Sequence, residues 1–213
     1  MPKRIGFDAD YFDRYYESEA SRVYGPAELA RLAQGLLGMI RWFGGEVGSV
    51  LDVGAGAGFL RDWFRQNEPS VRYVSVDASP YACRRYGHEQ RDIATWRAKE
   101  RFDLVVCQGV LPYLDDAAAS AALDNLATMS RGFLYLEAIT TRDLREVCDR
   151  DKTDAAVHPR PGAFYRKALS RHFVQVGCGL FYAKSGPLAF YELECAEPPG
   201  PSAVARKEGA VAS

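Results

Sequence analysis

The amino-acid sequence predicts an α/β domain whose doubly wound, mostly parallel sheet has seven strands, the last of them antiparallel. Short apolar runs of strand type alternate with segments whose apolar residues recur every three or four positions, as on one face of a helix. Near the C-terminal end, two strand-like runs follow each other with only the hairpin-sized link "KSG" between them. Strands separated by helices form parallel pairs with right-handed crossovers, whereas a short link gives an antiparallel pair.

The predicted elements follow one another along the chain. A helix begins at Pro26, which suits a first helical turn, and its apolar positions keep helical spacing until Gly44 and Gly45. Strands are expected at residues 49–53, 71–76, 88–91, 102–107, 132–139, 172–183 and 187–196. Further helices are expected at residues 58–67, 80–87 and 117–129. Helices placed in this way cover both faces of the sheet.

The chain divides into three predicted parts. Its 213 residues, 47% of them hydrophobic, suffice for one substantial core. We assign this core to a domain over residues 26–196, preceded by an aromatic segment at residues 1–25. Residues 197–213, "EPPGPSAVARKEGAVAS", are expected to form a flexible tail.

Charge and cysteine content narrow the function classes. A formal net charge of -1 gives no field that would gather polyanions, so neither nucleic acid nor a membrane surface is expected as a partner. The five cysteines are odd in number and lack metal-binding spacing, which is typical of reduced thiols in a cytoplasm. The first residues lack the apolar core of a signal peptide, and no run approaches about 18 consecutive apolar residues. We therefore expect a cytoplasmic protein that acts on a small molecule.

The stretch "LDVGAGAGFL" at residues 51–60 predicts a ligand cradle. It joins a strand to a helix, and Gly54, Gly56 and Gly58 let the backbone approach a ligand with no Cβ in the way. A tight turn that only packs a helix on its strand would use similar glycines. Asp77 ends the second strand and lies at a spacing from the turn that suits an acidic group on a ribose diol. A nicotinamide cofactor would fit equally, but the G-x-G-x-x-G form of dinucleotide enzymes is not matched.

Several ordered motifs extend this pattern: "VLDVGAGAGFL" (50–60), "VSVDASP" (74–80), "QRDIATW" (90–96) and "FDLVVCQGVLPYL" (102–114). With these motifs the chain resembles the class I S-adenosylmethionine-dependent methyltransferases of the small-molecule type, over roughly residues 48–196. The resemblance implies the Rossmann-like class I methyltransferase fold. It also implies S-adenosylmethionine as cofactor and S-adenosylhomocysteine as product.

The resemblance implies roles for residues at matching positions. Glycine-turn residues would line the methionine end of the cofactor, Asp77 would bind the ribose, and Asp92 and Ile93 would hold the adenine. The implied cofactor-binding residues are Asp52, Gly54, Ala55, Gly56, Asp77, Ala78, Asp92, Ile93, Gln108, Gly109 and Tyr16. A surface aspartate and a core isoleucine are the alternatives for Asp92 and Ile93. The tyrosines of the N-terminal segment are expected to form a flap over the cofactor, or else to pack on the following helix.

The segment at residues 140–164 is long and charged for a connection, so we expect it to cover an acceptor pocket. His158 lies on this segment and is the predicted catalytic base, since a neutral imidazole accepts protons near pH 7; an exposed loop histidine is the alternative. The predicted acceptor-binding residues are Tyr113, Glu137, Asp149 and Asp154. Asp149, Asp151 and Asp154 also allow a divalent cation, which the sequence does not require.

The sequence favours methyl transfer to a hydroxyl of a small metabolite, such as a sugar or a natural-product intermediate. Nucleobase enzymes are disfavoured because "QGVLPYL" has no Asn/Asp-Pro-Pro-aromatic stretch, and catechol-type metal enzymes because Gln108 stands where they have an aspartate. A small-molecule N-methyltransferase and a non-catalytic module that binds S-adenosylmethionine stay open, as does the choice between monomer and homodimer.

Overall fold

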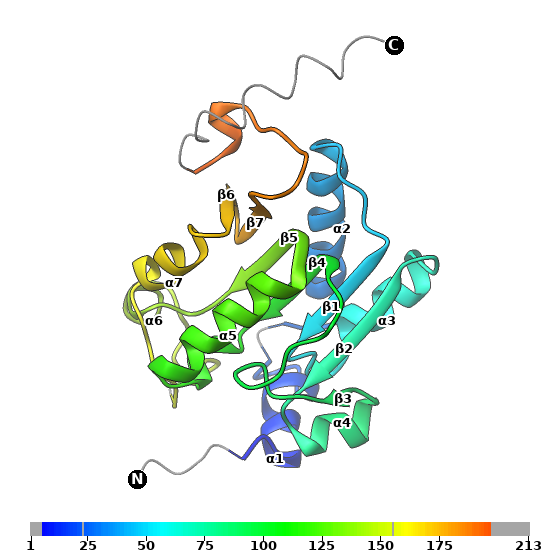
Figure 1. Cartoon of the computed structure of the whole chain (residues 1–213). Helices are drawn as coiled ribbons and strands as arrows, with labels where there is room; N and C mark the ends of the chain where they lie inside the picture. The colour runs from blue at the N-terminus through cyan, green and yellow to red at the C-terminus, as the bar shows by residue number, and fades with distance from the viewer. Residues whose placement is uncertain (1–5, 23, 155, 197–213) are drawn as a thin grey trace.

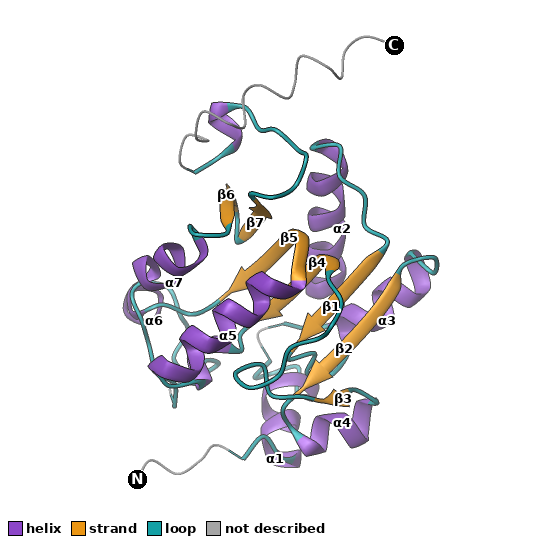
Figure 2. Cartoon of the chain, in the orientation of Figure 1, coloured by secondary structure: helices purple, strands orange, loops and turns teal. Residues whose placement is uncertain are grey.

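The computed structural model describes residues 6–22, 24–154 and 156–196. Its strands form one seven-stranded sheet in the order β3-β2-β1-β4-β5-β7-β6, whose strands Figure 2 shows in orange. The strands are β1 (Ser49–Val53), β2 (Arg72–Asp77), β3 (Glu89–Gln90), β4 (Phe102–Gln108), β5 (Ser130–Glu137), β6 (Phe173–Gly177) and β7 (Leu180–Ala183). β1 to β5 pair in parallel, and β7 runs antiparallel to both β5 and β6. The predicted fold class is therefore confirmed.

The helices fall close to the predicted segments. They are α1 (Ala9–Phe12), α2 (Pro26–Trp42), α3 (Phe59–Asn67), α4 (Pro80–Tyr86), α5 (Asp116–Met129), α6 (Thr141–Glu146) and α7 (Gly162–Leu169). Short turns of other helix types lie at η1 (Asp13–Glu17), η2 (Leu111–Tyr113) and η3 (Glu192–Glu194). Local capping explains several of the boundaries: Pro26 opens α2, Ser79 caps the start of α4, and Gly87 ends α4 in the left-handed conformation.

Two hydrophobic clusters cover the two faces of the sheet. Leu51 and Val105 belong to the cluster that packs against α5 and α7, and their neighbours Val50 and Leu104 belong to the cluster that packs against α2 and α3. Figure 1 shows α5 in front of the sheet. Burial on both faces explains why the central strands are continuously apolar rather than alternating. Among the described residues, no helix is both long and apolar enough to span a bilayer.

The end of the sheet differs from the sequence prediction. Both strands of the final hairpin lie within residues 172–183, and the turn between them contains Cys178 at a φ of 49°. The second predicted strand, 187–196, contains η3 instead, and the N–H of Ala196 donates to the carbonyl of Gln175. The prediction was wrong because the turn lies at "GCG", whose two glycines also adopt positive φ, and not at "KSG". The predicted tail, 197–213, lies outside the described residues.

The topology places the carboxyl ends of β1, β4 and β5 at one edge of the sheet. The glycine turn follows β1, η2 follows β4, and the segment containing α6 follows β5. In Figure 1 the N-terminal helix α1 lies near β3 and α4, beyond the ends of these strands. Such an edge, where successive crossovers go to opposite faces, is the usual ligand site of an open α/β sheet.

Candidate functional site

The glycine turn is fixed to the neighbouring strand through its backbone. Gly54 and Ala55 both donate their N–H groups to the carbonyl of Val76 on β2, at 2.8 and 3.1 Å. Gly54 has a φ of +73°, and a Cβ on it would lie 2.1 Å from a methyl carbon of Val110. Only glycine meets both the conformation and the space at this position.

Asp77 braces the turn from the end of β2. Its Oδ2 accepts the N–H of Gly56 at 3.0 Å, and its Oδ1 accepts the N–H of Ser79 at 2.8 Å. Burial raises the pKa of this carboxyl above its usual value, although the backbone donors act in the opposite direction. The carboxylate is thus held in one orientation, and its remaining acceptor positions can meet the hydroxyls of a ribose.

Asp52 is buried beneath the turn. Its side chain is 4% exposed, and its Oδ2 accepts a hydrogen bond of 2.8 Å from the hydroxyl of Tyr73. Burial raises the pKa of Asp52 to about 7, even though the Tyr73 hydroxyl favours the charged form. The carboxyl therefore changes charge close to neutral pH.

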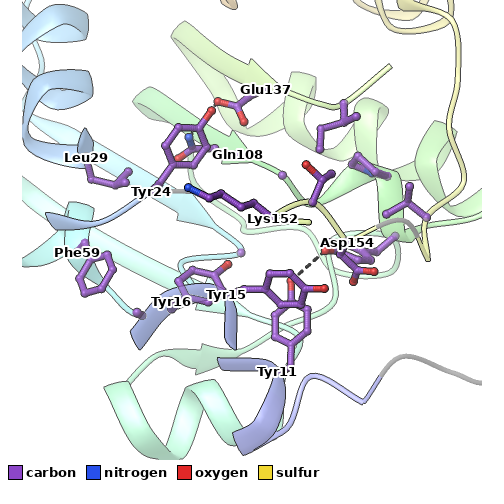
Figure 3. Close-up of a pocket in the computed structure, with 18 of the residues that line it drawn as sticks. Tyr11, Tyr15, Tyr16, Tyr24, Leu29, Phe59, Gln108, Glu137, Lys152 and Asp154 are labelled. Carbon is purple, nitrogen blue, oxygen red and sulfur yellow. Dashed lines mark hydrogen bonds between the residues drawn. The ribbon is translucent and has the colours of Figure 1, made fainter. Parts of the chain in front are cut away.

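A cavity of about 480 Å³ opens next to the turn, and Figure 3 shows side chains that line it. Its walls come from the N-terminal segment, the ends of β1, β4 and β5, and the segment that follows β5. The polar and aromatic lining residues are Tyr11, Tyr15, Tyr16, Tyr24, Asp52, Phe59, Gln108, Tyr113, Glu137, Asp149, Lys152, Thr153 and Asp154. The volume lies in the range of small-molecule sites.

The N-terminal tyrosines form one wall of the cavity. The hydroxyls of Tyr11 and Tyr113 lie 2.9 Å apart, although the two residues are 102 positions apart in sequence. Tyr16 stacks on Phe12 and covers Gly56, since a Cβ on that glycine would lie 2.7 Å from the tyrosine ring. Burial raises the pKa of Tyr11, Tyr16 and Tyr113, so these hydroxyls stay protonated. The placement agrees with the predicted flap, whose movement stays a prediction.

Glu137 carries a hydrogen-bonded carboxylate at the end of β5. Its Oε2 accepts from the amide of Gln108 at 2.9 Å and from the hydroxyl of Tyr135 at 3.2 Å. Figure 3 shows Tyr24 pointing toward Glu137, and burial together with that carboxylate raises the pKa of Tyr24. The N-terminal segment therefore reaches the sheet at this carboxylate.

The segment after β5 forms the opposite wall of the cavity; that residues 140–164 cover an acceptor stays a prediction. Asp149, Lys152 and Asp154 line the cavity, and Figure 3 shows Lys152 extending across it. Lys152 has no signature in the sequence, because a lone lysine in a charged segment carries no pattern. Among the lining residues that the structure describes, three carboxylates on this side, including Glu137, thus share the cavity with one ammonium group.

Arg160 anchors this segment to the end of β4. Its guanidinium is 4% exposed and donates to the carbonyls of Leu111, His158 and Leu114. Its Nε donates to the Oδ1 of Asp116 at 2.8 Å. A buried arginine with backbone partners on η2 fixes one end of this cavity wall, and no sequence pattern marks it.

The structure brings ten of the predicted site residues to the cavity: Asp52, Gly54, Ala55, Gln108, Gly109, Tyr16, Tyr113, Glu137, Asp149 and Asp154. Gly56 and Asp77 lie just behind them, at the Tyr16 ring. Ala78, Asp92 and Ile93 do not line the cavity. Asp92 is exposed and accepts the N–H of Ala94, while Ile93 is 4% exposed in the core, and the adenine-binding roles of both stay predictions.

His158 is not where the sequence placed it. Its side chain is exposed and does not line the cavity, whereas the adjacent Val157 does. The N–H of His158 donates to the carbonyl of Pro112 at 2.7 Å, which fixes the segment at this point.

The part of the chain that the structure describes contains no preassembled metal site. Within it, no three His, Cys, Asp or Glu side chains are grouped so that they could hold a metal ion. Asp149 and Asp151 are both exposed, and Asp149 accepts the N–H of Asp151 through its side chain. These acidic residues cap their own turns.

Comparison with known proteins identifies the family. Residues 18–177 match the family model described as "Methyltransferase domain". The fold is similar to that of the sugar N-methyltransferase KedS8 from Streptoalloteichus sp ATCC 53650, with a TM-score of 0.60 and 18% identity over 86% of this chain and 94% of that one. It is also similar to the N-methyltransferase NodS from Bradyrhizobium japonicum WM9 in complex with S-adenosylhomocysteine, with a TM-score of 0.52 and 21% identity over 74% and 87% of the two chains.

A third similar structure is the magnesium protoporphyrin IX methyltransferase ChlM from Synechocystis PCC 6803 with bound S-adenosylmethionine. Its TM-score is 0.51, with 18% identity over 84% of this chain and 93% of that one. No curated protein matches the chain significantly in sequence. The family match spans most of the chain, and the strand order is that of the predicted fold. The chain therefore belongs to the class I S-adenosylmethionine-dependent methyltransferases.

Proposed function

We propose that this protein transfers the methyl group of S-adenosylmethionine to an amino group of a small molecule. The observation that carries the choice of acceptor is the charge of the cavity wall: among the described lining residues, Glu137, Asp149 and Asp154 outnumber the one cation, Lys152. The sequence favoured a hydroxyl acceptor because it offered His158 as a base, and that imidazole lies outside the cavity.

The residues around the glycine turn fit the cofactor. Gly54 and Gly56 leave the turn without side chains, and Asp77 offers a fixed carboxylate to ribose hydroxyls. When bound, the cofactor supplies an electrophilic methyl group on a positively charged sulfur. The tyrosine faces of Tyr11, Tyr15 and Tyr16 suit a neighbouring cation and exclude water from it.

The acceptor wall suits a protonated amine. Aliphatic amines carry a positive charge at neutral pH, so a cavity with an excess of carboxylates attracts them. Before its nitrogen can attack, the amine must give up one proton, and Glu137 lies at the strand end next to Gln108 to receive it. A hydroxyl acceptor needs a stronger base, and no histidine is among the described residues that line the cavity.

Labelled cofactor tests the proposal. The purified protein is incubated with methyl-labelled S-adenosylmethionine and matched pairs of acceptors, such as an amino sugar and the sugar with a hydroxyl in its place. We expect label in the amines and not in their hydroxyl partners. Label only in the hydroxyl partners would refute the amine assignment, and binding of S-adenosylhomocysteine without any transfer would favour a non-catalytic module.

Glu137→Gln tests the role of the carboxylate. Removing a charged hydrogen-bond partner should lower kcat/KM for the amine by roughly 10- to 100-fold, while affinity for S-adenosylhomocysteine changes little. Glu46→Gln, an exposed position outside the cavity, is the matched control. If both variants turn over alike, Glu137 has no part in amine recognition.

A further inference from the structure

His88 is a buried histidine whose surroundings belong to the glycine turn. It follows Gly87, whose left-handed conformation ends α4 and directs the chain back toward the sheet. The side chain is 7% exposed. Its Nε2 lies 3.0 Å from the carbonyl oxygen of Gly56, and its Nδ1 lies 2.9 Å from the hydroxyl of Ser75 on β2.

These contacts determine the tautomer of the ring. A carbonyl oxygen only accepts, so the hydrogen must be on Nε2, which donates to Gly56. Nδ1 of the neutral ring then accepts from Ser75, and Arg61 points a second donor at it from 3.5 Å. The Ser75 hydroxyl could also accept from a protonated ring, but Arg61 has only donors and suits only a neutral Nδ1.

Gly56 is thereby held from two sides. Its N–H donates to Asp77 and its carbonyl accepts from His88, so neither polar group of this residue is free to reorient. We propose that His88 is a positioning residue for the cofactor turn: the neutral imidazole holds the Gly56 carbonyl, and protonation of the ring releases this hold and weakens cofactor binding. The inference rests on the cofactor site proposed above.

The charged groups around the His88 ring raise or lower its pKa. Arg61 faces Nδ1 from α3 and is itself 8% exposed, while its partner Asp62 is mostly exposed. Asp77 lies across Gly56, and the ring of Tyr86 lies 6.3 Å away. Burial and Arg61 lower the pKa of His88, although the Gly56 carbonyl and both aspartates act to raise it.

A proton added to Nδ1 would replace an accepting atom with a donor that faces the guanidinium. The acceptor that faces Arg61 would be lost, and two positive charges would meet in a buried space. Relief requires movement of the ring away from Arg61, and the hydrogen bond to Gly56 moves with it. Cofactor affinity should therefore fall as the solution becomes acidic.

Calorimetric titration with S-adenosylhomocysteine tests the proposal from about pH 8 to about pH 5. We expect the dissociation constant of the wild type to rise in acid. His88→Gln keeps an N–H donor for Gly56 but has no proton to gain, so it should bind nearly as well at pH 8 and show a flatter profile. His88→Ala should weaken binding at pH 8 by roughly 5- to 100-fold, the cost of leaving buried partners unsatisfied. His172→Gln, an exposed histidine, is the control and should follow the wild type.

Equal pH profiles for the wild type and His88→Gln would overturn the proposal. So would unchanged affinity in a folded His88→Ala variant. If His88→Ala does not fold, the comparison between the wild type and the glutamine variant still decides. Failure of the wild type to bind S-adenosylhomocysteine at any pH would instead refute the cofactor site itself.

Discussion

The two ends of the cavity are built in different ways. At the cofactor end, hydrogen bonds to the backbone from the neighbouring strand β2 and from His88 position the groups: Val76 holds the turn, and Asp77 and His88 hold Gly56. At the acceptor end, side chains distant in sequence meet, as in the pair formed by Tyr11 and Tyr113. The difference teaches that the turn and its hydrogen bonds form the cofactor site, while the shape of the acceptor site depends on how two chain segments pack together.

The largest expected effect comes from the anchor of the acceptor wall. Arg160→Ala removes the donor that serves several carbonyls, so the free energy of unfolding should fall by about 3–5 kcal/mol, at roughly 1–3 kcal/mol for each buried carbonyl left without a donor. Urea denaturation measures this change. Arg131→Ala removes an exposed pair with Asp103 and should cost only about 0–1 kcal/mol.

The same variant sharpens the comparison between the two ends. Where Arg160→Ala is still folded, affinity for S-adenosylhomocysteine should stay within a few-fold of the wild type, because none of its partners belongs to the glycine turn. A large loss of cofactor affinity without a loss of stability would show that the two ends are not independent.

Gly54→Ala breaks the cofactor end. Alanine at this position must adopt a φ of +73°, and its methyl group clashes with Val110. Together the two effects should destabilise the fold by about 2–3 kcal/mol. Cofactor affinity should fall with it, by calorimetry with S-adenosylhomocysteine. Gly35→Ala in α2 meets no atom within 4 Å and should stabilise the chain by about 0.5–1 kcal/mol. Similar outcomes for the two variants would refute the argument from conformation.

Asp52→Asn tests the titration of a buried carboxyl. In the folded chain Asp52 has a pKa of about 7, and in an unfolded chain an aspartate titrates near 3.9. Between these two pKa values the folded state holds more protons than the unfolded state, so a rise in pH lowers the free energy of unfolding. Above the folded-state pKa of Asp52 this decrease in the free energy of unfolding is complete. Asparagine has no charge to bury. As the pH rises from about 4 to about 8, the free energy of unfolding of the variant should therefore increase by about 1–3 kcal/mol relative to that of the wild type.

Urea denaturation at several pH values measures this gain. Asp149→Asn, at an exposed position, is the control and should differ little from the wild type at any pH. A stability difference between Asp52→Asn and the wild type that does not change with pH would contradict the assignment of the titration to Asp52.

The smallest effect is expected for His158→Ala. Its exposed side chain lies outside the cavity, so turnover with the acceptor found by labelling should change less than about twofold. Steady-state kinetics across the neutral pH range measures it. A loss of roughly 10²- to 10⁴-fold, together with loss of the acid limb, would restore His158 as a general base.

The sequence predicted the cofactor end well because its signals are local. Gly54 has the positive φ that a glycine between a strand and a helix suggests, and Asp77 reaches the turn from the adjacent strand. The sheet followed from apolar runs of strand length. The final hairpin did not, since "GCG" and "KSG" are both plausible turns and only pairing of β7 with β5 decides between them.

The acceptor end was harder to predict for a physical reason. Whether Val157 or His158 enters the cavity depends on a hydrogen bond to Pro112, which is distant in sequence. Arg160 is one of many arginines, and nothing in its neighbours marks it as buried. His88 is similar, because its partners on β2 and in the glycine turn are 13 and 32 positions away.

The Arg160 anchor makes the acceptor wall indifferent to acidity. An arginine side chain keeps its charge under all ordinary conditions, and its carbonyl partners on Leu111, Leu114 and His158 have no proton to gain. The titrating groups Asp52 and His88 lie at the other end of the cavity. Mild acid should therefore weaken cofactor binding while the acceptor wall stays assembled, so a higher cofactor concentration should restore the occupancy of the cofactor site.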